Sequence, residues 1–108
     1  MKLRGFILHI PFLWVEGMAL FPLILVRRRK CTPTLINHER IHLRQQLEML
    51  IIPFYIWYVL EYLILLLYFR NHHLAYRFIS FEREAFTNER RPDYLRKRPF
   101  WAFLRYIF

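Results

Sequence analysis

The chain has a single cysteine, Cys31, and only two glycines in 108 residues. One cysteine excludes a disulfide within the chain and also a zinc site built from several cysteines. We expect Cys31 to be a free thiol without a role. Internal repeats and low-complexity linkers are also missing, and the length bounds the chain to one domain at most, residues 1–108. A domain of this size buries a thin core, so we expect support from a metal, a membrane or a partner.

Acidic residues are scarce, with 8 Asp and Glu against 17 Lys and Arg, which gives a formal net charge of +9. Hydrophobic residues make up 56% of the same chain. A chain that is both apolar and basic favours three kinds of partner: a membrane with anionic lipids, nucleic acid, or an acidic protein surface. The basic residues gather mainly at 27–30 and 90–98, and strongly apolar stretches separate them. Because a nucleic-acid groove does not need such stretches, nucleic acid is the weakest of these partners.

The first block, residues 1–26, is an apolar N-terminal segment. Prolines and polar residues interrupt it, which disfavours a continuous membrane helix. Pro11, Glu16 and the missing A-x-A cleavage pattern also argue against a signal peptide, so we expect the segment to belong to the mature protein. Residues 19–26 are rich in β-forming side chains, and they predict an edge strand with Pro22 at an exposed position.

The most apolar run, residues 49–69, has the length of a membrane span. So small a domain has few other elements to cover such a helix on all sides, so we predict that the run contacts a membrane. Basic residues beside the apolar blocks, including Arg70, fit an interfacial arrangement. The alternative is the core helix of a soluble protein. Glu61 within the run is expected to be functional, or to bond to a histidine or arginine of the N-terminal segment.

Helical periodicity is clear from Leu35 onward, where Thr34 or Asn37 is expected to cap the helix. Pro53 is expected to kink or end it. A further helix is predicted over 74–90.

The C-terminal tail, residues 92–108, alternates basic with aromatic side chains. This pattern indicates one or two short amphipathic helices that lie on a membrane surface or pack back on the core. The predicted fold class is therefore mainly α with a small β element, an α+β arrangement.

The stretch NHERIHLRQQLE contains His-Glu-x-x-His at His38, Glu39 and His42. Histidines four apart on a helix point the same way and can share one tetrahedral zinc ion. The intervening Glu39 then lies beside the metal, where it can take a proton from water and pass it to a leaving amine. The alternative is a solvent-facing helix with two ordinary histidines, on which Glu39 pairs with nearby arginines.

A third zinc ligand is expected further along the chain. Glu82 shares a mostly apolar helix face, whereas Glu84 shares a face that looks solvated. A carboxylate on a buried face needs a partner, and zinc is a suitable one, so we choose Glu82. Its alternative role is a buried ion pair, for instance with an arginine. The other candidates considered are Glu89, His72 and His73, of which the two histidines are expected in a loop or near the substrate.

HERIH at 38–42 followed by FEREAF at 81–86 resembles the gluzincin metallopeptidases. The resemblance is closest to small minimal-scaffold gluzincins and to the catalytic cores of integral-membrane peptidases. These families use His-Glu-x-x-His plus a later glutamate, often within Glu-x-x-Ala-Asp, and Glu82 and Ala85 match that pattern. Phe86 stands where the families have an aspartate that orients a zinc histidine, so the resemblance implies that Glu89 or Asn88 takes this role.

The resemblance implies a zincin-like minimal scaffold and zinc-dependent hydrolysis of a peptide or protein substrate, with Glu39 as base and then acid. It also implies that the strand at 19–26 binds extended substrate by strand addition. NHERIHLRQQLE further resembles a family of small bacterial proteins. We expect the chain to be membrane-associated, at the bacterial inner membrane, on a side that the sequence does not fix. The alternative function is a non-catalytic membrane or interfacial interaction protein whose metal site is structural or missing.

Two more residues, Gln45 and Tyr76, and again His73 are candidates for supporting roles. Gln45 is expected to hydrogen-bond behind a zinc histidine or to be a plain polar helix position. Tyr76 and His73 are possible stabilisers of a tetrahedral oxyanion.

Overall fold

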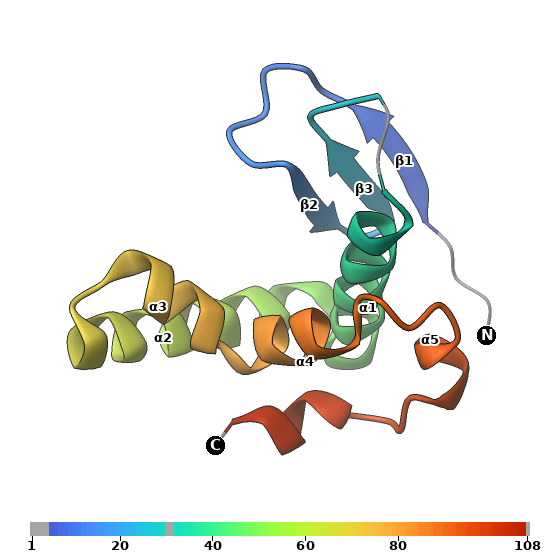
Figure 1. The fold of residues 1–108 in the computed structure, drawn as a ribbon. Coiled ribbons are helices and arrows are strands. Elements are labelled where there is room, and N and C mark those ends of the chain that lie inside the picture. The colour runs from blue at the N-terminus through green and yellow to red at the C-terminus, as the bar shows by residue number, and fades with distance from the viewer. Residues whose placement is uncertain (1–4, 30–31, 108) are drawn as a thin grey trace.

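The computed structural model describes residues 5–29 and 32–107, so Cys31 lies outside the described residues. Within these ranges the chain forms five α-helices, a 3-10 turn and a three-stranded sheet (Figure 1). The prediction of a mainly helical α+β fold is therefore confirmed.

The sheet consists of β1 (Phe6–His9), β2 (Gly17–Leu20) and β3 (Leu23–Val26), in the order β1-β3-β2. β1 runs parallel to β3, and β2 runs antiparallel to it. The prediction of one edge strand over 19–26 is wrong, because the chain turns at Phe21–Pro22 and its two halves pair with each other. Proline has no backbone N–H to continue a ladder, which favours a turn at this exposed position. β3 is the central strand, and β2 is an edge.

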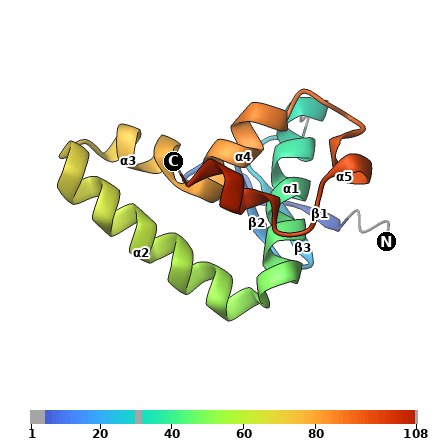
Figure 2. The same ribbon diagram turned by 90° about the horizontal axis from the view of Figure 1, so that it is seen from below.

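Helix α1 (Pro33–Met49) carries the His-Glu-x-x-His motif. Its cap is Thr32, whose hydroxyl accepts a hydrogen bond from the backbone N–H of Leu35 at 3.1 Å, so neither Thr34 nor Asn37 has the capping role predicted for it. The helix ends at Met49, and Leu50 takes a φ of 60°, after which the chain changes direction (Figure 2). The predicted break at Pro53 thus falls a few residues earlier. Pro53 lies in the first turn of the next helix, where a backbone N–H is not required.

The apolar run forms α2 (Ile51–Phe69), followed by α3 (His72–Phe78) and α4 (Ser80–Asn88). The predicted single helix over 74–90 is therefore two helices that meet at Ile79. Glu61 of α2 accounts for the break, because its carboxylate accepts hydrogen bonds from the backbone N–H of Ser80 at 2.8 Å and from the Ser80 hydroxyl. Glu61 also accepts a hydrogen bond from Trp57. Its carboxylate therefore caps α4, and among residues 5–29 of the N-terminal segment it has no hydrogen-bond partner.

The C-terminal tail forms α5 (Tyr94–Lys97) and the 3-10 turn η1 (Ala102–Tyr106), and η1 packs against α4. Phe103 of η1 is fully buried against Phe81 of α4, with ring centroids 4.5 Å apart. The predicted packing of the tail on the core is therefore observed for η1, and contact of the tail with a membrane surface stays a prediction.

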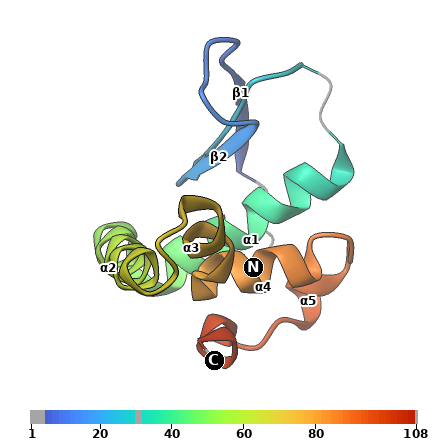
Figure 3. The same cartoon turned by 60° about the vertical axis from the view of Figure 1, so that its left-hand side comes forward.

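Helix α1 lies at the centre of the molecule. It packs against β2 and β3 on one side and against α2 and α4 on the other (Figures 1 and 3). The motif helix is thus enclosed between the sheet and the later helices. In contrast, α2 contacts the other described elements along one side only, chiefly α3 and α1 and through single side chains α4 and η1. Its opposite side is exposed among the described residues (Figure 2).

Candidate metal centre

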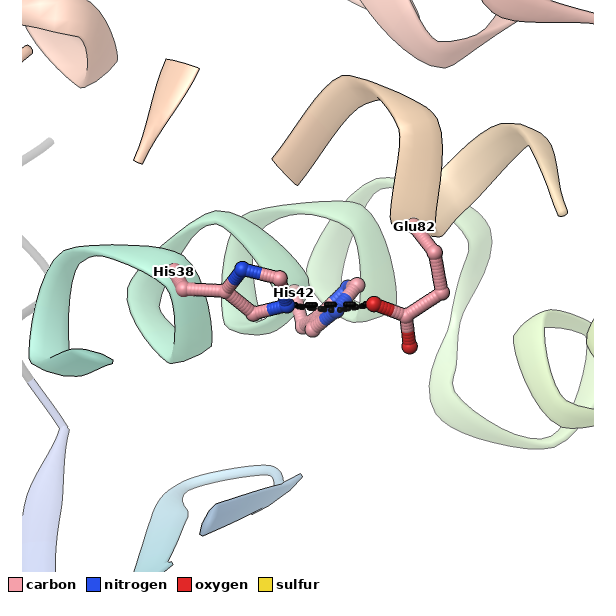
Figure 4. Close-up of side chains that lie close together, drawn as sticks. All are labelled: His38, His42 and Glu82. Atoms are coloured by element: carbon pink, nitrogen blue, oxygen red, sulfur yellow. Dashed lines mark hydrogen bonds and ion pairs between the residues drawn. The ribbon is translucent and has the colours of Figure 1, made fainter. Parts of the chain in front are cut away.

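His38 and His42 lie one turn apart on α1, and Glu82 reaches them from the first turn of α4 (Figure 4). Their Nε2 atoms are 3.2 Å apart, and each lies 3.0 Å from Oε1 of Glu82. A tetrahedral ion with bonds of about 2.0–2.1 Å holds its ligand atoms roughly 3.3 Å apart. The three atoms are therefore spaced nearly as a zinc ion requires, and all three residues are buried.

The far side of each imidazole is held by an oxygen atom. Nδ1 of His38 lies 2.9 Å from a carboxylate oxygen of Glu89, and Nδ1 of His42 lies 2.7 Å from the amide oxygen of Gln45. Both acceptors favour a proton on Nδ1, so that Nε2 is the nitrogen whose lone pair a neutral imidazole would offer to a metal. Of the two residues expected to replace the missing aspartate, Glu89 contacts a histidine, whereas the side chain of Asn88 bonds to Glu84 and Tyr106.

Glu82 is held from the opposite side by a residue that the sequence analysis missed. The hydroxyl of Tyr58, on α2, donates a hydrogen bond of 2.6 Å to Oε2 of Glu82 and leaves Oε1 to the histidines. Nothing in the sequence separates Tyr58 from the other aromatic residues of the apolar run. Within the described part of the chain, the ion-pair partners of Glu82 are the two histidines, so the alternative of an arginine pair is not observed.

In the absence of metal, the protonation states of His42 and Glu82 set the charge of the site. Burial lowers the pKa of His42, but the charge and hydrogen bond of Glu82 outweigh burial. With smaller contributions from Glu39 and Gln45, the pKa of His42 rises from 6.5 to about 9. Burial raises the pKa of Glu82, but the two histidines outweigh this effect and hold it far below its usual range. At neutral pH the metal-free site therefore contains a protonated His42 beside an ionised Glu82.

Glu39 lies on the side of α1 that faces the sheet. A Cβ atom added to Gly17 of β2 would lie 3.1 Å from Oε2 of Glu39, so glycine leaves the room that this carboxylate occupies. Glu39 is buried, and across residues 5–29 and 32–107 it makes no hydrogen bond or ion pair, so the predicted alternative of pairing with arginines is not observed there. Burial raises its pKa despite the nearby histidines. A carboxylate without a partner and with a raised pKa is suited to accept a proton.

The prediction that Glu84 lies on a solvated face is wrong. Glu84 is fully buried and accepts hydrogen bonds from Arg98, Tyr94 and Gln45. The reason is that the C-terminal segment folds over this face of α4, which the helical periodicity of α4 alone does not reveal.

The remaining candidates lie on α3. His72 and His73 form its first turn after the Asn71 cap, so the expectation that they form a loop is wrong, and a place near the substrate stays a prediction. His72 hydrogen-bonds the Tyr62 hydroxyl at 2.6 Å, and His73 is exposed. Tyr76 is half-buried close to Glu82, and burial together with the Glu82 charge raises its pKa. Of the two residues considered for oxyanion stabilisation, Tyr76 therefore lies near the site, and that role stays a prediction.

No protein-family model, curated protein or solved structure matches this chain.

Proposed function

We propose that this protein is a small, membrane-associated, zinc-dependent peptidase of the gluzincin type. His38, His42 and Glu82 would hold the metal, and Glu39 would be the general base. The observation that carries the proposal is the convergence of two Nε2 atoms and one carboxylate oxygen at 3.0–3.2 Å from one another. The donor set, two imidazoles and one carboxylate, suits catalytic zinc and leaves a position for water.

Zinc, when bound, supplies a Lewis acid that polarises a carbonyl group and makes water acidic near neutral pH. The chain's own contribution is proton transfer. Glu39 takes a proton from the attacking water as the C–O bond forms, and it gives a proton to the amine nitrogen as the C–N bond breaks. Because the carboxylate of Glu39 is buried and without a partner among the described residues, it is available for both transfers.

The edge of β2 supports binding of an extended peptide next to Glu39. Alternate residues of a strand direct their backbone groups to the same edge, so Gly17 and Ala19 share the open edge of β2. The Ala19 carbonyl already accepts hydrogen bonds from Gln46 at 2.9 Å and from Tyr55 at 2.7 Å. The backbone groups of Gly17 have no such partner among the described residues. A substrate would pair there by strand addition, close to Glu39, and not along the whole of the predicted strand at 19–26.

A minimal zincin-like scaffold is supported by the order of the elements around the site. An edge strand lies beside the motif helix, and a later helix brings the glutamate. Phe86 takes the position of the families' aspartate, and its ring lies edge-on to His38 with centroids 4.5 Å apart. The orienting carboxylate comes instead from Glu89. The departure from the pattern is therefore compensated by a residue one helical turn further on.

Metal analysis with a peptidase assay tests this proposal. We expect the purified protein to bind one zinc ion, to hydrolyse a quenched-fluorescence peptide library, and to lose this activity on treatment with a chelator. Added zinc should restore activity and raise the unfolding temperature, because a ligand that binds only the folded state stabilises it. His73→Ala removes an exposed histidine outside the site and controls for zinc bound by surface histidines. This variant should keep its zinc. A folded protein that binds no zinc would contradict the proposal.

The membrane association that we propose is supported by the open side of α2. This helix is long and apolar enough to cross a membrane, and only 6% of its most apolar window is buried, unlike a soluble core helix. Phe54 is its one buried residue. A bilayer with anionic lipids fits both this apolar face and the net charge of +9. The exposed large apolar residues of α2 are Ile52, Ile56, Val59, Leu60, Leu63, Ile64, Leu67 and Tyr68.

Vesicle flotation tests the membrane association. We expect the protein to float with vesicles that contain phosphatidylglycerol, and the double change Ile64→Glu and Leu67→Glu to reduce the bound fraction, because two charges then enter the apolar face. Leu104→Glu places a charge on an exposed apolar residue of η1, outside α2, and should leave flotation unchanged. Monomeric protein that stays in the aqueous fraction would exclude this role for α2.

A further inference from the structure

Arg98 is a buried cation that comes from the C-terminal segment and lies between the two helices of the candidate site. Its side chain has no exposed surface. The guanidinium donates to the carboxylate of Glu84 on α4 through Nε and, at 3.1 Å, through Nη2. Nη1 donates to Oε2 of Glu48 on α1 at 2.6 Å. One arginine thus joins α1, which carries both histidines, to α4, which carries Glu82.

This ion-pair network reaches a candidate metal ligand through Gln45. The amide nitrogen of Gln45 donates to Oε1 of Glu84 at 2.9 Å and to the backbone carbonyl of Phe81 at 3.1 Å. A side-chain amide has a donor end and an acceptor end, so two acceptors at one end fix which way it points. The Gln45 oxygen is therefore turned to Nδ1 of His42, which must donate, and Nε2 of His42 is left for the metal.

We propose that Arg98 is a positioning residue for the metal centre, which acts on His42 through Glu84 and Gln45. This inference rests on the proposed function in taking His42 as a ligand. Without Arg98, the buried Glu84 loses its charged partner, and Tyr94 and Gln45 remain as its hydrogen-bond donors. The Gln45 amide then depends more on the Phe81 carbonyl for its orientation, and its oxygen is held less firmly toward His42. His38 has no part in this relay, because Glu89 holds its Nδ1 atom.

The hydrogen bonds that run from Arg98 through Glu84 and Gln45 to His42 make the metal centre depend on a segment far in sequence from the His-Glu-x-x-His motif. Tyr94 also donates to Glu84, at 2.7 Å, and the backbone N–H of Trp101 donates to Glu48 at 3.2 Å. The segment from α5 to η1 therefore contributes the network that orients His42. The segment supplies no metal ligand, but its packing on α1 and α4 holds in place the residues that orient His42.

Histidine side-chain NMR with zinc titration tests the proposal. We expect Arg98→Met to weaken zinc binding about tenfold, as for other residues that support a metal ligand. In metal-free protein, the same change should shift the Nδ1–H signal of His42 and leave that of His38 unchanged. Arg96→Met removes an exposed arginine from the same segment and should alter neither measurement.

A second variant keeps the test decisive if Arg98→Met does not fold. Gln45→Met removes the link between Glu84 and His42 but retains Arg98 and both of its carboxylate partners, and it should give the same shift of His42 alone. Wild-type zinc affinity with an unchanged His42 signal in folded Gln45→Met protein would overturn the proposal, as would equal shifts of both histidines. If the unaltered chain binds no zinc, the proposed function fails, whereas the NMR comparison in metal-free protein still tests the positioning.

Discussion

Replacing Glu39 with glutamine is expected to leave zinc binding intact and to reduce peptide hydrolysis by about 10²–10⁴-fold. Glutamine keeps the size of the side chain beside Gly17, so the packing between α1 and β2 is retained. An amide cannot take a proton from water under these conditions, so the step that needs a base becomes slow. Zinc content by mass spectrometry of the native protein and initial rates on a peptide substrate measure the two effects separately.

Asp93→Asn is the matched control for this change, because it also converts a carboxylate to an amide but at an exposed position on the C-terminal segment. It should alter neither zinc content nor rate. Full activity of the Glu39→Gln protein would exclude Glu39 as the base. Unchanged zinc content together with no activity in either the native or the altered protein would favour the alternative function, a non-catalytic membrane protein with a structural metal site.

The affinity for zinc is expected to rise with pH by about tenfold per unit below pH 9, or roughly two orders of magnitude between pH 7 and pH 9. Zinc must displace the proton on Nε2 of His42, whose pKa is raised to about 9 in the metal-free protein. Glu82 has a lowered pKa, is already ionised in this range and adds no proton to the exchange. Competition titrations against a chelator, corrected for the chelator's own protonation, measure the slope.

The stability of the metal-free protein should change with pH in the opposite direction. A raised histidine pKa contributes stability below pH 6.5, and this contribution is lost as the pH rises toward 9. The unfolding temperatures of the zinc-free and zinc-bound forms should therefore move apart between these values. A zinc affinity that does not vary over this interval would show that His42 is not the group that zinc deprotonates.

The sequence predicted the fold class and the helical motif because both depend on local patterns. The apolar periodicity around His38 and His42 indicates which side of that helix is buried, without reference to any other part of the chain. The turn at Pro22 and the break at Ile79 were missed for a different reason. Each depends on a partner elsewhere in the chain, namely the opposite half of a hairpin and the carboxylate of Glu61.

The same distinction applies to the candidate site. The two histidines and Glu82 could be chosen from spacing and from the apolar face of one helix, and the structure brings them together. The burial of Glu84 could not be foreseen, because Arg98 covers it from a separate segment. Tyr58 was missed because its role depends on how α2 crosses α4 and not on any pattern within the apolar run.

The side-chain amide of Gln46 has a consequence for the solution behaviour of this protein. It accepts from the Phe21 N–H at 2.7 Å and donates to the Ala19 carbonyl at 2.9 Å, as the backbone of a neighbouring strand would. Strand edges with a continuous row of free N–H and C=O groups recruit other chains and lead to aggregation. Because the Gln46 amide occupies the Phe21 N–H and the Ala19 carbonyl, few backbone groups on this edge of β2 are left to pair with a strand of another molecule. We therefore expect intermolecular sheet formation along this edge to be restricted.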